Sequence, residues 1–130
     1  MAGTETSTPA VVTAARASLS NRLRGAVLTD ADPGYEQARR VWNGCIDRRP
    51  AVIAQCESTA DVVAAVRVAG ERGLPVAVRG GGHSLPGFST CDGGIVVDLS
   101  AMRAVQVDPD RRVAIAQGGA RWGELVKISV

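Results

Sequence analysis

The sequence predicts an α+β fold that contains a mixed parallel and antiparallel sheet with flanking helices. A parallel unit is indicated by two apolar runs, at 51–54 and 74–78, which flank an amphipathic stretch at 59–72. An antiparallel hairpin is indicated at 105–107 and 113–116, two strand-like segments that flank an Asp-Pro-Asp turn. A strand–helix–strand unit that is followed by a hairpin favours a mixed sheet.

The chain divides into three parts by composition. Residues 1–14 are rich in Thr, Ser and Ala, and are expected to form a disordered lead-in. Residues 15–47 are expected to form an N-terminal helical segment, because the stretches 17–24 and 35–42 are both helix-compatible and are followed closely by glycine. Residues 48–130 then carry the strands and the rest of the domain.

The helix expected at 59–72 has clear boundary signals. Ser58 can cap its first turn, and Asp61 places a negative charge near the positive end of the helix dipole. Apolar residues at helical spacing, expected to form its buried face, are Val62, Val66 and Ala69. The remaining elements are a buried strand and a last helix, expected at 95–99 and 121–127.

Composition excludes several classes of function. The 15 basic and 13 acidic residues give a net charge of +2, too small to attract nucleic acid or anionic membranes by a long-range field. No apolar run approaches the roughly 20 residues of a membrane helix, and the polar start is not typical of a secretory signal. A cytoplasmic protein is therefore expected, with neither nucleic acid nor a membrane among its partners.

The cysteines and tryptophans predict structural rather than chemical roles. Cys45, Cys56 and Cys91 are odd in number and widely spaced, which indicates neither a zinc site nor a disulfide framework. We expect them to be buried reduced thiols, and we expect no metal site. Trp42 and Trp122 are expected to be packing residues.

The sharpest feature is the sequence Arg-Gly-Gly-Gly-His-Ser at 79–84, directly after a predicted strand. Consecutive glycines expose backbone N–H groups to an anion and can adopt positive φ. Ser84 adds a hydroxyl donor. The segment has no P-loop lysine and no G-x-G-x-x-G pattern, so neither a nucleoside-triphosphate P-loop nor a Rossmann site is indicated. A flexible turn without a ligand is the alternative interpretation.

His83 is the only histidine of the chain. It follows the glycines, outside any apolar helix or strand face, so its imidazole can lie against whatever the loop binds. A neutral imidazole at that place can serve as a base or as a nucleophile near physiological pH. A structural or solvated histidine is the alternative.

At this point the chain resembles a known family, the FAD-linked oxidases of the berberine bridge enzyme-like group. Their FAD domain is of the vanillyl-alcohol oxidase, or PCMH, type. The blocks that carry the resemblance are Val-Arg-Gly-Gly-Gly-His-Ser-Leu-Pro-Gly at 78–87, Gly-Ile-Val-Val-Asp-Leu-Ser at 94–100, Gln-Gly-Gly-Ala-Arg-Trp-Gly-Glu-Leu at 117–125, and the upstream segments 34–43 and 49–54.

The resemblance implies specific roles for these residues. Those that would bind FAD are Gly80, Gly81, Gly82, His83, Ser84, Gln117, Gly118 and Gly119. Arg79 is a further candidate for FAD binding: its side chain is expected either to contact a phosphate or to cap the end of the strand. In this group the loop that matches residues 80–84 holds the FAD pyrophosphate, which implies the same role for residues 80–84 here. The histidine that matches His83 is often bonded to the flavin. The reaction implied is hydride transfer from an organic substrate to flavin.

The resemblance covers only the first part of such an enzyme. It implies that a second flavin-linking cysteine, the substrate domain and the catalytic base lie downstream, so no catalytic residue is assigned and an incomplete, truncated FAD domain is expected. A small organic substrate is expected only for a full-length form, and this fragment alone is not expected to be active. Two alternatives stay open: a non-catalytic fragment that binds phosphate or a nucleotide, and a non-functional truncated product.

Overall fold

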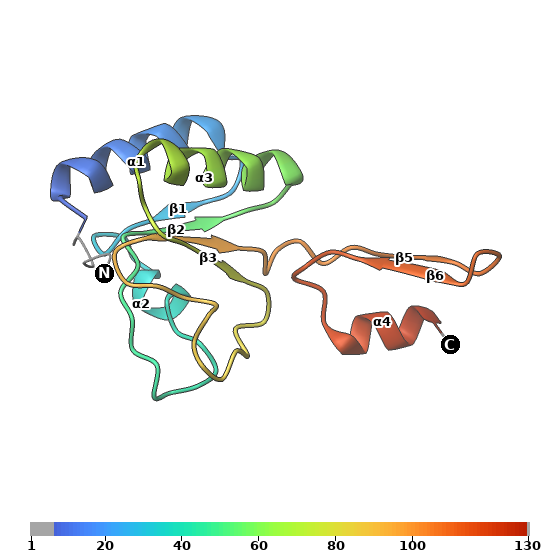
Figure 1. Ribbon diagram of the computed structural model, residues 1–130. Helices are drawn as coiled ribbons and strands as arrows, with labels where there is room; N and C mark the ends of the chain where they lie inside the picture. The colour runs from blue at the N-terminus through green and yellow to red at the C-terminus, as the bar shows by residue number, and fades with distance from the viewer. Residues whose placement is uncertain (1–6, 130) are drawn as a thin grey trace.

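The computed structural model describes residues 7–129. Figure 1 labels its helices and strands, which are numbered in the order of the chain. They are α1 (Pro9–Arg22), β1 (Val27–Leu28), α2 (Tyr35–Ala38), β2 (Val52–Gln55), α3 (Thr59–Glu71), β3 (Val76–Arg79), β4 (Ile95–Asp98), β5 (Val105–Asp108), β6 (Val113–Ala116) and α4 (Trp122–Ser129).

The main sheet has four strands in the order β1-β2-β4-β3. Strands β2, β4 and β3 are parallel, and β1 pairs antiparallel with β2. Strands β5 and β6 form a separate antiparallel hairpin. The α+β fold with parallel and antiparallel pairs is therefore confirmed. In the parallel register Asp98 lies beside both Gln55 and Arg79, so the carboxyl ends of β2, β4 and β3 meet at one edge of the sheet.

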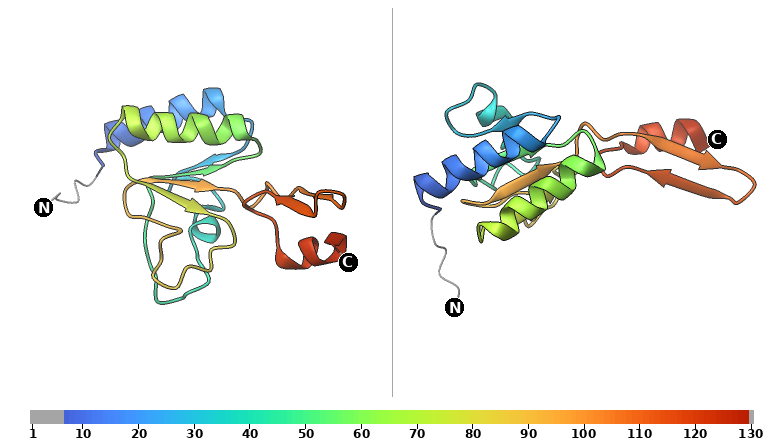
Figure 2. Two further views of the ribbon diagram at one scale, coloured as in Figure 1. Left: turned by 45° about the vertical axis from the view of Figure 1, so that its right-hand side comes forward. Right: turned by 90° about the horizontal axis from the view of Figure 1, so that it is seen from above.

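Helices cover the two faces of this sheet unequally. Helices α1 and α3 lie side by side over one face, and the short helix α2 lies on the opposite side (Figures 1 and 2). Strand β4 is buried along its whole length because it is central and covered on both faces. The larger core cluster, beneath α1 and α3, includes Leu19, Val52, Val68, Ile95 and Val97; the smaller one contains Tyr35, Ile53, Ala77 and Val96.

A buried carboxylate joins the α1–β1 connection to the start of α3. The Asp61 side chain is only 1% exposed and accepts hydrogen bonds from the backbone amides of Arg24 (2.9 Å), Gly25 (3.1 Å) and Glu57 (3.0 Å). Burial opposes its ionisation, but these amide bonds prevail and hold the pKa of Asp61 below its usual value. Asp61 also closes the predicted cap, since its amide donates to Ser58 Oγ at 3.2 Å.

The N-terminal expectations need two corrections. Helix α1 begins at Pro9, where Thr8 caps the first turn, so the expected disorder is wrong for residues 9–14; residues 1–6 lie outside the described part. The helix is stabilised there because Ala15 and Leu19 are buried in the core beneath α3. The segment 15–47 is not wholly helical either, because β1 pairs with β2.

The expected buried face of α3 is confirmed at Ala69 and wrong at Val66, while Val62 is partly buried against the core. Asp61, Ala65, Val68 and Ala69 are buried, whereas Val66 is 48% exposed. Ala65, Val68 and Ala69 of α3 belong to the same core cluster as Ala15 and Leu19 of α1. The buried face thus includes one valine and two alanines, and its position depends on the packing of the helix in the fold.

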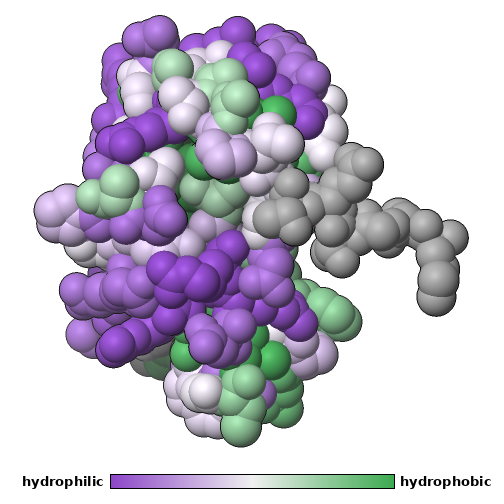
Figure 3. Space-filling model, turned by 90° about the vertical axis from the view of Figure 1, so that its left-hand side faces the viewer, coloured by the Kyte–Doolittle hydropathy of each residue, from purple (hydrophilic) through white to green (hydrophobic). Residues whose placement is uncertain are grey.

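The hairpin and α4 project from the main sheet (Figures 1 and 2). All residues of β6 are exposed, and Ile115 of β6 and Trp122 of α4 are 64% and 81% exposed. The packing role expected for Trp122 is therefore wrong. By contrast, the face of the molecule seen from the side on which α1 begins is mainly hydrophilic, with small separate hydrophobic patches (Figure 3). Exposed apolar surface is thus a marked feature of the hairpin and α4.

Candidate functional site

The glycine loop, residues 80–84, begins where β3 ends. The last ladder bond joins the Leu99 amide to the Arg79 carbonyl at 2.8 Å, and the chain then leaves the sheet. Gly82 has a φ of +73°, a conformation that favours glycine. Within residues 7–129, no amide of the glycine loop donates a hydrogen bond to a protein acceptor. Consecutive unpaired amides of this kind fit a bound anion such as a pyrophosphate.

The second predicted stretch, residues 117–119, lies against this loop. A side chain at Gly80 would collide with the carbonyl oxygen of Gly118, and a side chain at Gly119 would collide with the carbonyl oxygen of Leu99. The Gly119 amide donates to Met102 at 3.0 Å. The structure therefore brings together the two glycine-containing segments that the sequence singled out, although they are far apart along the chain.

Gln117 has a different setting from the two glycines that follow it. Its side-chain oxygen accepts from the Ala104 amide at 2.9 Å, and its own amide donates to the Ala104 carbonyl at 2.9 Å. Gln117 therefore closes the base of the β5–β6 hairpin. This pairing fixes where residues 118 and 119 lie relative to the glycine loop.

Arg79 links the glycine loop to α2 and to the edge of the sheet. Its Nη1 donates to the carbonyl of Ala38, and its buried Nε has no partner in the described part of the chain. Arg79 and Asp98 are neighbours in the β3–β4 register and line a cavity of about 380 Å³, together with Gln37, Gln55 and Ser100 among others. Ligands of parallel sheets commonly bind at this carboxyl edge.

The imidazole of His83 lies close to a tryptophan and to a glycine. The rings of His83 and Trp42 have centroids 5.9 Å apart and are inclined by 38°. A side-chain carbon on Gly81 would lie 2.8 Å from His83 Cδ2, so only glycine leaves room for this ring position. His83 is itself exposed, and Trp42 is 66% exposed. The packing role expected for Trp42 is thus wrong, because its ring lies at the site instead of in the core.

The segment 38–48 holds the glycine loop from outside. The Trp42 amide donates to Gly82 O at 3.0 Å, and Asn43 Nδ2 donates to Leu85 O at 2.9 Å. Arg48 Nη1 donates to Gly87 O at 2.5 Å. Ser84 shapes the turn that follows the loop, since its hydroxyl oxygen accepts from the Phe88 amide at 3.0 Å. Sequence reasoning missed Asn43 as a contact residue; its place next to Trp42 was the only local signal.

The three cysteines are free and lie in different environments. Cys45 is exposed, Cys91 is half-buried and Cys56 is buried, so the expectation of buried thiols is wrong for Cys45. Burial raises the pKa of the Cys56 thiol to about 11. A thiol with this pKa is a poor nucleophile at neutral pH.

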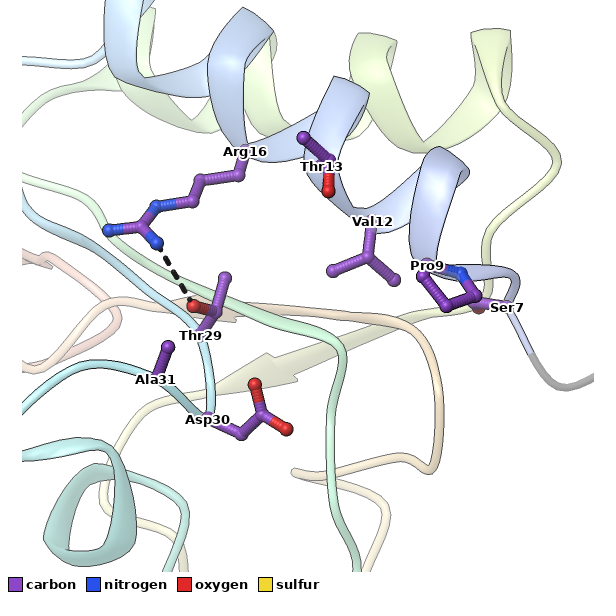
Figure 4. A pocket seen from close by; sticks show the side chains of 8 residues that line it. All are labelled: Ser7, Pro9, Val12, Thr13, Arg16, Thr29, Asp30 and Ala31. Carbon is purple, nitrogen blue, oxygen red and sulfur yellow. Dashed lines mark hydrogen bonds between the residues drawn. The ribbon is translucent and has the colours of Figure 1, made fainter.

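A second cavity, of about 440 Å³, lies between α1 and the turn after β1 (Figure 4). It contains none of the predicted site residues. Arg16, which lines this cavity, donates to Thr29 Oγ1 at 3.2 Å and to Asp32 Oδ1 at 2.7 Å. These two bonds join α1 to the turn that follows β1. Along residues 7–129, no helix is both long and apolar enough to cross a membrane.

Comparison with known proteins identifies the family. A family model described as an FAD binding domain matches residues 50–129. The FAD-linked oxidoreductase hasG of Aspergillus fumigatus is 46% identical over 114 residues, which are 86% of this chain and 24% of that protein. The (R)-6-hydroxynicotine oxidase of Paenarthrobacter nicotinovorans is 40% identical over 105 residues, which are 81% of this chain and 23% of that protein.

Solved structures agree with the sequence relatives. The crystal structure of 6-hydroxy-D-nicotine oxidase from Arthrobacter nicotinovorans matches 82% of this chain and 23% of its own, with a TM-score of 0.77 and 40% identity. The BBE-like 1 protein of Physcomitrella patens matches 85% and 24%, with a TM-score of 0.79 and 26% identity. The chain spans about a quarter of the length of the relatives it matches. The resemblance to the berberine bridge enzyme-like group is confirmed, and FAD is its cofactor: the chain belongs to the FAD-binding domain family of FAD-linked oxidoreductases.

Proposed function

We propose that the glycine loop, with Arg79 beside it and residues 117–119 against it, holds the pyrophosphate of FAD. The observation that carries this proposal is the run of amides at residues 80–84 without protein acceptors, at the carboxyl end of a parallel strand. A doubly charged pyrophosphate would satisfy these donors together. The Ser84 hydroxyl can add a donor, because its oxygen already accepts from Phe88.

Two features suit this loop to a phosphate group without a lysine. The absence of side chains at residues 80–82 lets an anion approach the main chain directly. The guanidinium of Arg79 supplies a positive charge beside Gly82, and its unpaired Nε leaves it with unused donor capacity. Gln117, Gly118 and Gly119 would complete the wall on the hairpin side.

We further propose that the domain serves an oxidoreductase that removes a hydride from a small organic substrate. FAD, when bound, supplies the hydride acceptor. The relatives that support this proposal are FAD-linked oxidoreductases and oxidases. The three free thiols are compatible with a reducing, cytoplasmic compartment. Nucleic acid and membranes are not proposed as partners, because a net charge of +2 is too small to attract them by a long-range electrostatic field.

His83 is the proposed point of covalent attachment to the flavin. The bond would join an imidazole nitrogen to the flavin 8α-methyl carbon, and the nitrogen and the carbon would each lose one hydrogen. His83 would supply the nucleophilic nitrogen; bound flavin would supply the carbon and take up the two electrons and two protons released, with dioxygen as the final oxidant, itself reduced to hydrogen peroxide. This proposal is supported by the position of His83, whose exposed imidazole lies on the same loop as the proposed pyrophosphate site.

The experiment that tests the pyrophosphate site measures FAD affinity by titration calorimetry for the unmodified chain and for two glycine variants. Gly80→Ala forces a side chain against the Gly118 carbonyl, whereas Gly70→Ala, in α3, meets nothing within 4 Å and serves as the control. We expect Gly80→Ala to weaken FAD binding at least about tenfold, equivalent to about 1.4 kcal/mol, and Gly70→Ala to bind like the unmodified chain. Equal affinities in all three proteins would contradict the proposal.

A further inference from the structure

We infer that Trp42 is a positioning residue, which holds the imidazole of His83 in the orientation it needs to meet the flavin. This inference rests on the proposed role of His83. It adds a residue from a distant part of the chain to the site, and a reason why an exposed tryptophan is placed there.

The ring contact is the first observation that carries the inference. The centroids of Trp42 and His83 are 5.9 Å apart and the rings are inclined by 38°. The imidazole also lies close to Gly81, where an added side-chain carbon would be 2.8 Å from Cδ2. The exposed imidazole therefore has two close neighbours, an indole and a backbone that carries no side chain.

The second observation is that Trp42 is fixed to the glycine loop through its own backbone. Its amide donates to Gly82 O at 3.0 Å, one residue before the histidine. The next residue, Asn43, forms a second bond to the segment that carries His83: its Nδ2 donates to Leu85 O at 2.9 Å. The acceptors of these two bonds lie on either side of His83 in the sequence, so the backbone that carries Trp42 is held against the loop that carries His83.

The third observation is the exposure of Trp42. Its residue surface is 66% exposed, so it contributes little to the hydrophobic core. The segment that carries it is held independently by Arg39, which pairs with Glu36 at 2.8 Å and with Asp47 at 2.6 Å. The fold therefore has other means of anchoring this segment, and the indole is free to act on the histidine.

The physical effect of the contact is a loss of freedom for the imidazole. A histidine that follows three glycines would otherwise sample many backbone and side-chain conformations. Holding a reacting group in one orientation before reaction raises the probability of a productive encounter. Trp42 would thus favour the bond between His83 and the flavin without touching the reacting atoms.

The test follows the imidazole protons of the chain by NMR, with and without excess FAD. His83 is the only histidine, so its ring signals need no separation from others. The variants are Trp42→Ala, Trp42→Phe and, as a control at the other exposed tryptophan, Trp122→Ala. We expect Trp42→Ala to move the His83 signals to the positions of free histidine and to abolish their response to FAD. Trp42→Phe should retain that response, and Trp122→Ala should match the unmodified chain.

The outcomes separate this inference from the proposed function. If FAD shifts the amides of residues 80–84 in every variant, but Trp42→Ala leaves the imidazole response unchanged, the role of Trp42 is wrong and the FAD site stands. If FAD shifts no loop amide in the unmodified chain, the proposed site is itself wrong. If the amides of residues 80–84 stop responding to FAD in Trp42→Ala but still respond in Trp42→Phe, an aromatic positioning role is supported. If they stop responding in both variants, Trp42 has a structural role in the fold and the inference is overturned.

Discussion

Gly80 and Gly118 lie backbone to backbone, so close that a Cβ on Gly80 would overlap the carbonyl oxygen of Gly118. The contact joins the end of β3 to the segment that follows β6, and so joins the main sheet to the projecting hairpin. A bulky residue at position 80 must therefore separate the two segments that form the proposed site.

This contact leads to a first prediction, on the stability of the hairpin. We expect Gly80→Val to release β5–β6 from the main sheet, with faster hydrogen exchange at Gly119, whose amide donates to Met102. The ladder of β2, β4 and β3 should exchange as before. Exchange measured by NMR checks this, with Gly123→Val, where no neighbour lies within 4 Å, as the matched control. Unchanged protection at Gly119 would show that the contact is not needed.

The second prediction concerns Asp61 and acid stability. The folded pKa of Asp61 is lowered, so its contribution is fully present above an unfolded pKa of about 3.9 and is lost as pH falls through the folded value. Asp61→Asn removes a charged acceptor from a buried site and should lower the free energy of unfolding by about 1–3 kcal/mol at pH 7. Urea unfolding at pH 7 and at decreasing pH measures both effects.

Asp110 supplies the control for this prediction, because it is exposed in the turn of the hairpin. Asp110→Asn should leave stability within about 0.5 kcal/mol of the unmodified chain. If Asp61→Asn also changes the free energy of unfolding by no more than this, the backbone amides that donate to Asp61 are satisfied by other means in the variant, and the role assigned to Asp61 is wrong.

The third prediction separates the cysteines by their reactivity. Cys45 is exposed, whereas Cys56 is buried with a pKa of about 11. Iodoacetamide at pH 8 should therefore modify Cys45 first and leave Cys56 unmodified until the chain is unfolded. Peptide mass mapping over time measures the order. If Cys56 were modified in the folded chain as fast as Cys45, the buried position of Cys56, directly after β2, would be contradicted.

The fourth prediction concerns the bond to the flavin, in a polypeptide that extends beyond this domain and completes the flavin pocket. After acid denaturation, flavin should remain attached to the peptide that contains His83. His83→Ala should release the flavin and leave the fold intact, because the side chain is exposed on a loop. Flavin that stays attached in His83→Ala, with no second link mapped, would show that another residue forms the bond.

Much of the fold follows from local sequence signals. The cap at Ser58, the apolar run of β4 and the turn between β5 and β6 each depend on neighbouring residues, and each lies where the pattern predicts it. Helix α1 was predicted only in part: the helix-compatible stretch 17–24 overlaps it, but residues 9–14 were expected to be disordered although Thr8 and Pro9 are a local start signal. Burial of Ala15 and Leu19 in the core stabilises this helix, which has no regular amphipathic pattern. β1 was missed because a two-residue strand depends on its partner β2.

The site was predictable in part for the same reason. Three glycines and a histidine form one local pattern, so residues 80–84 could be singled out from the sequence. The contacts of Trp42 and Asn43 with this loop join segments about 40 residues apart, and no local pattern records such a contact. The position of Gly118 against Gly80 likewise depends on the path of the hairpin.

The central claim is that the amides of residues 80–84 bind the FAD pyrophosphate, and the most direct measurement is a backbone amide NMR titration of the chain with FAD, ADP and adenosine. We predict that FAD and ADP shift the amide signals of residues 80–84 and of residues 118 and 119, and that adenosine, which has no phosphate, does not. Shifts that are equal for adenosine and ADP, or that fall elsewhere and spare residues 80–84, would contradict the claim.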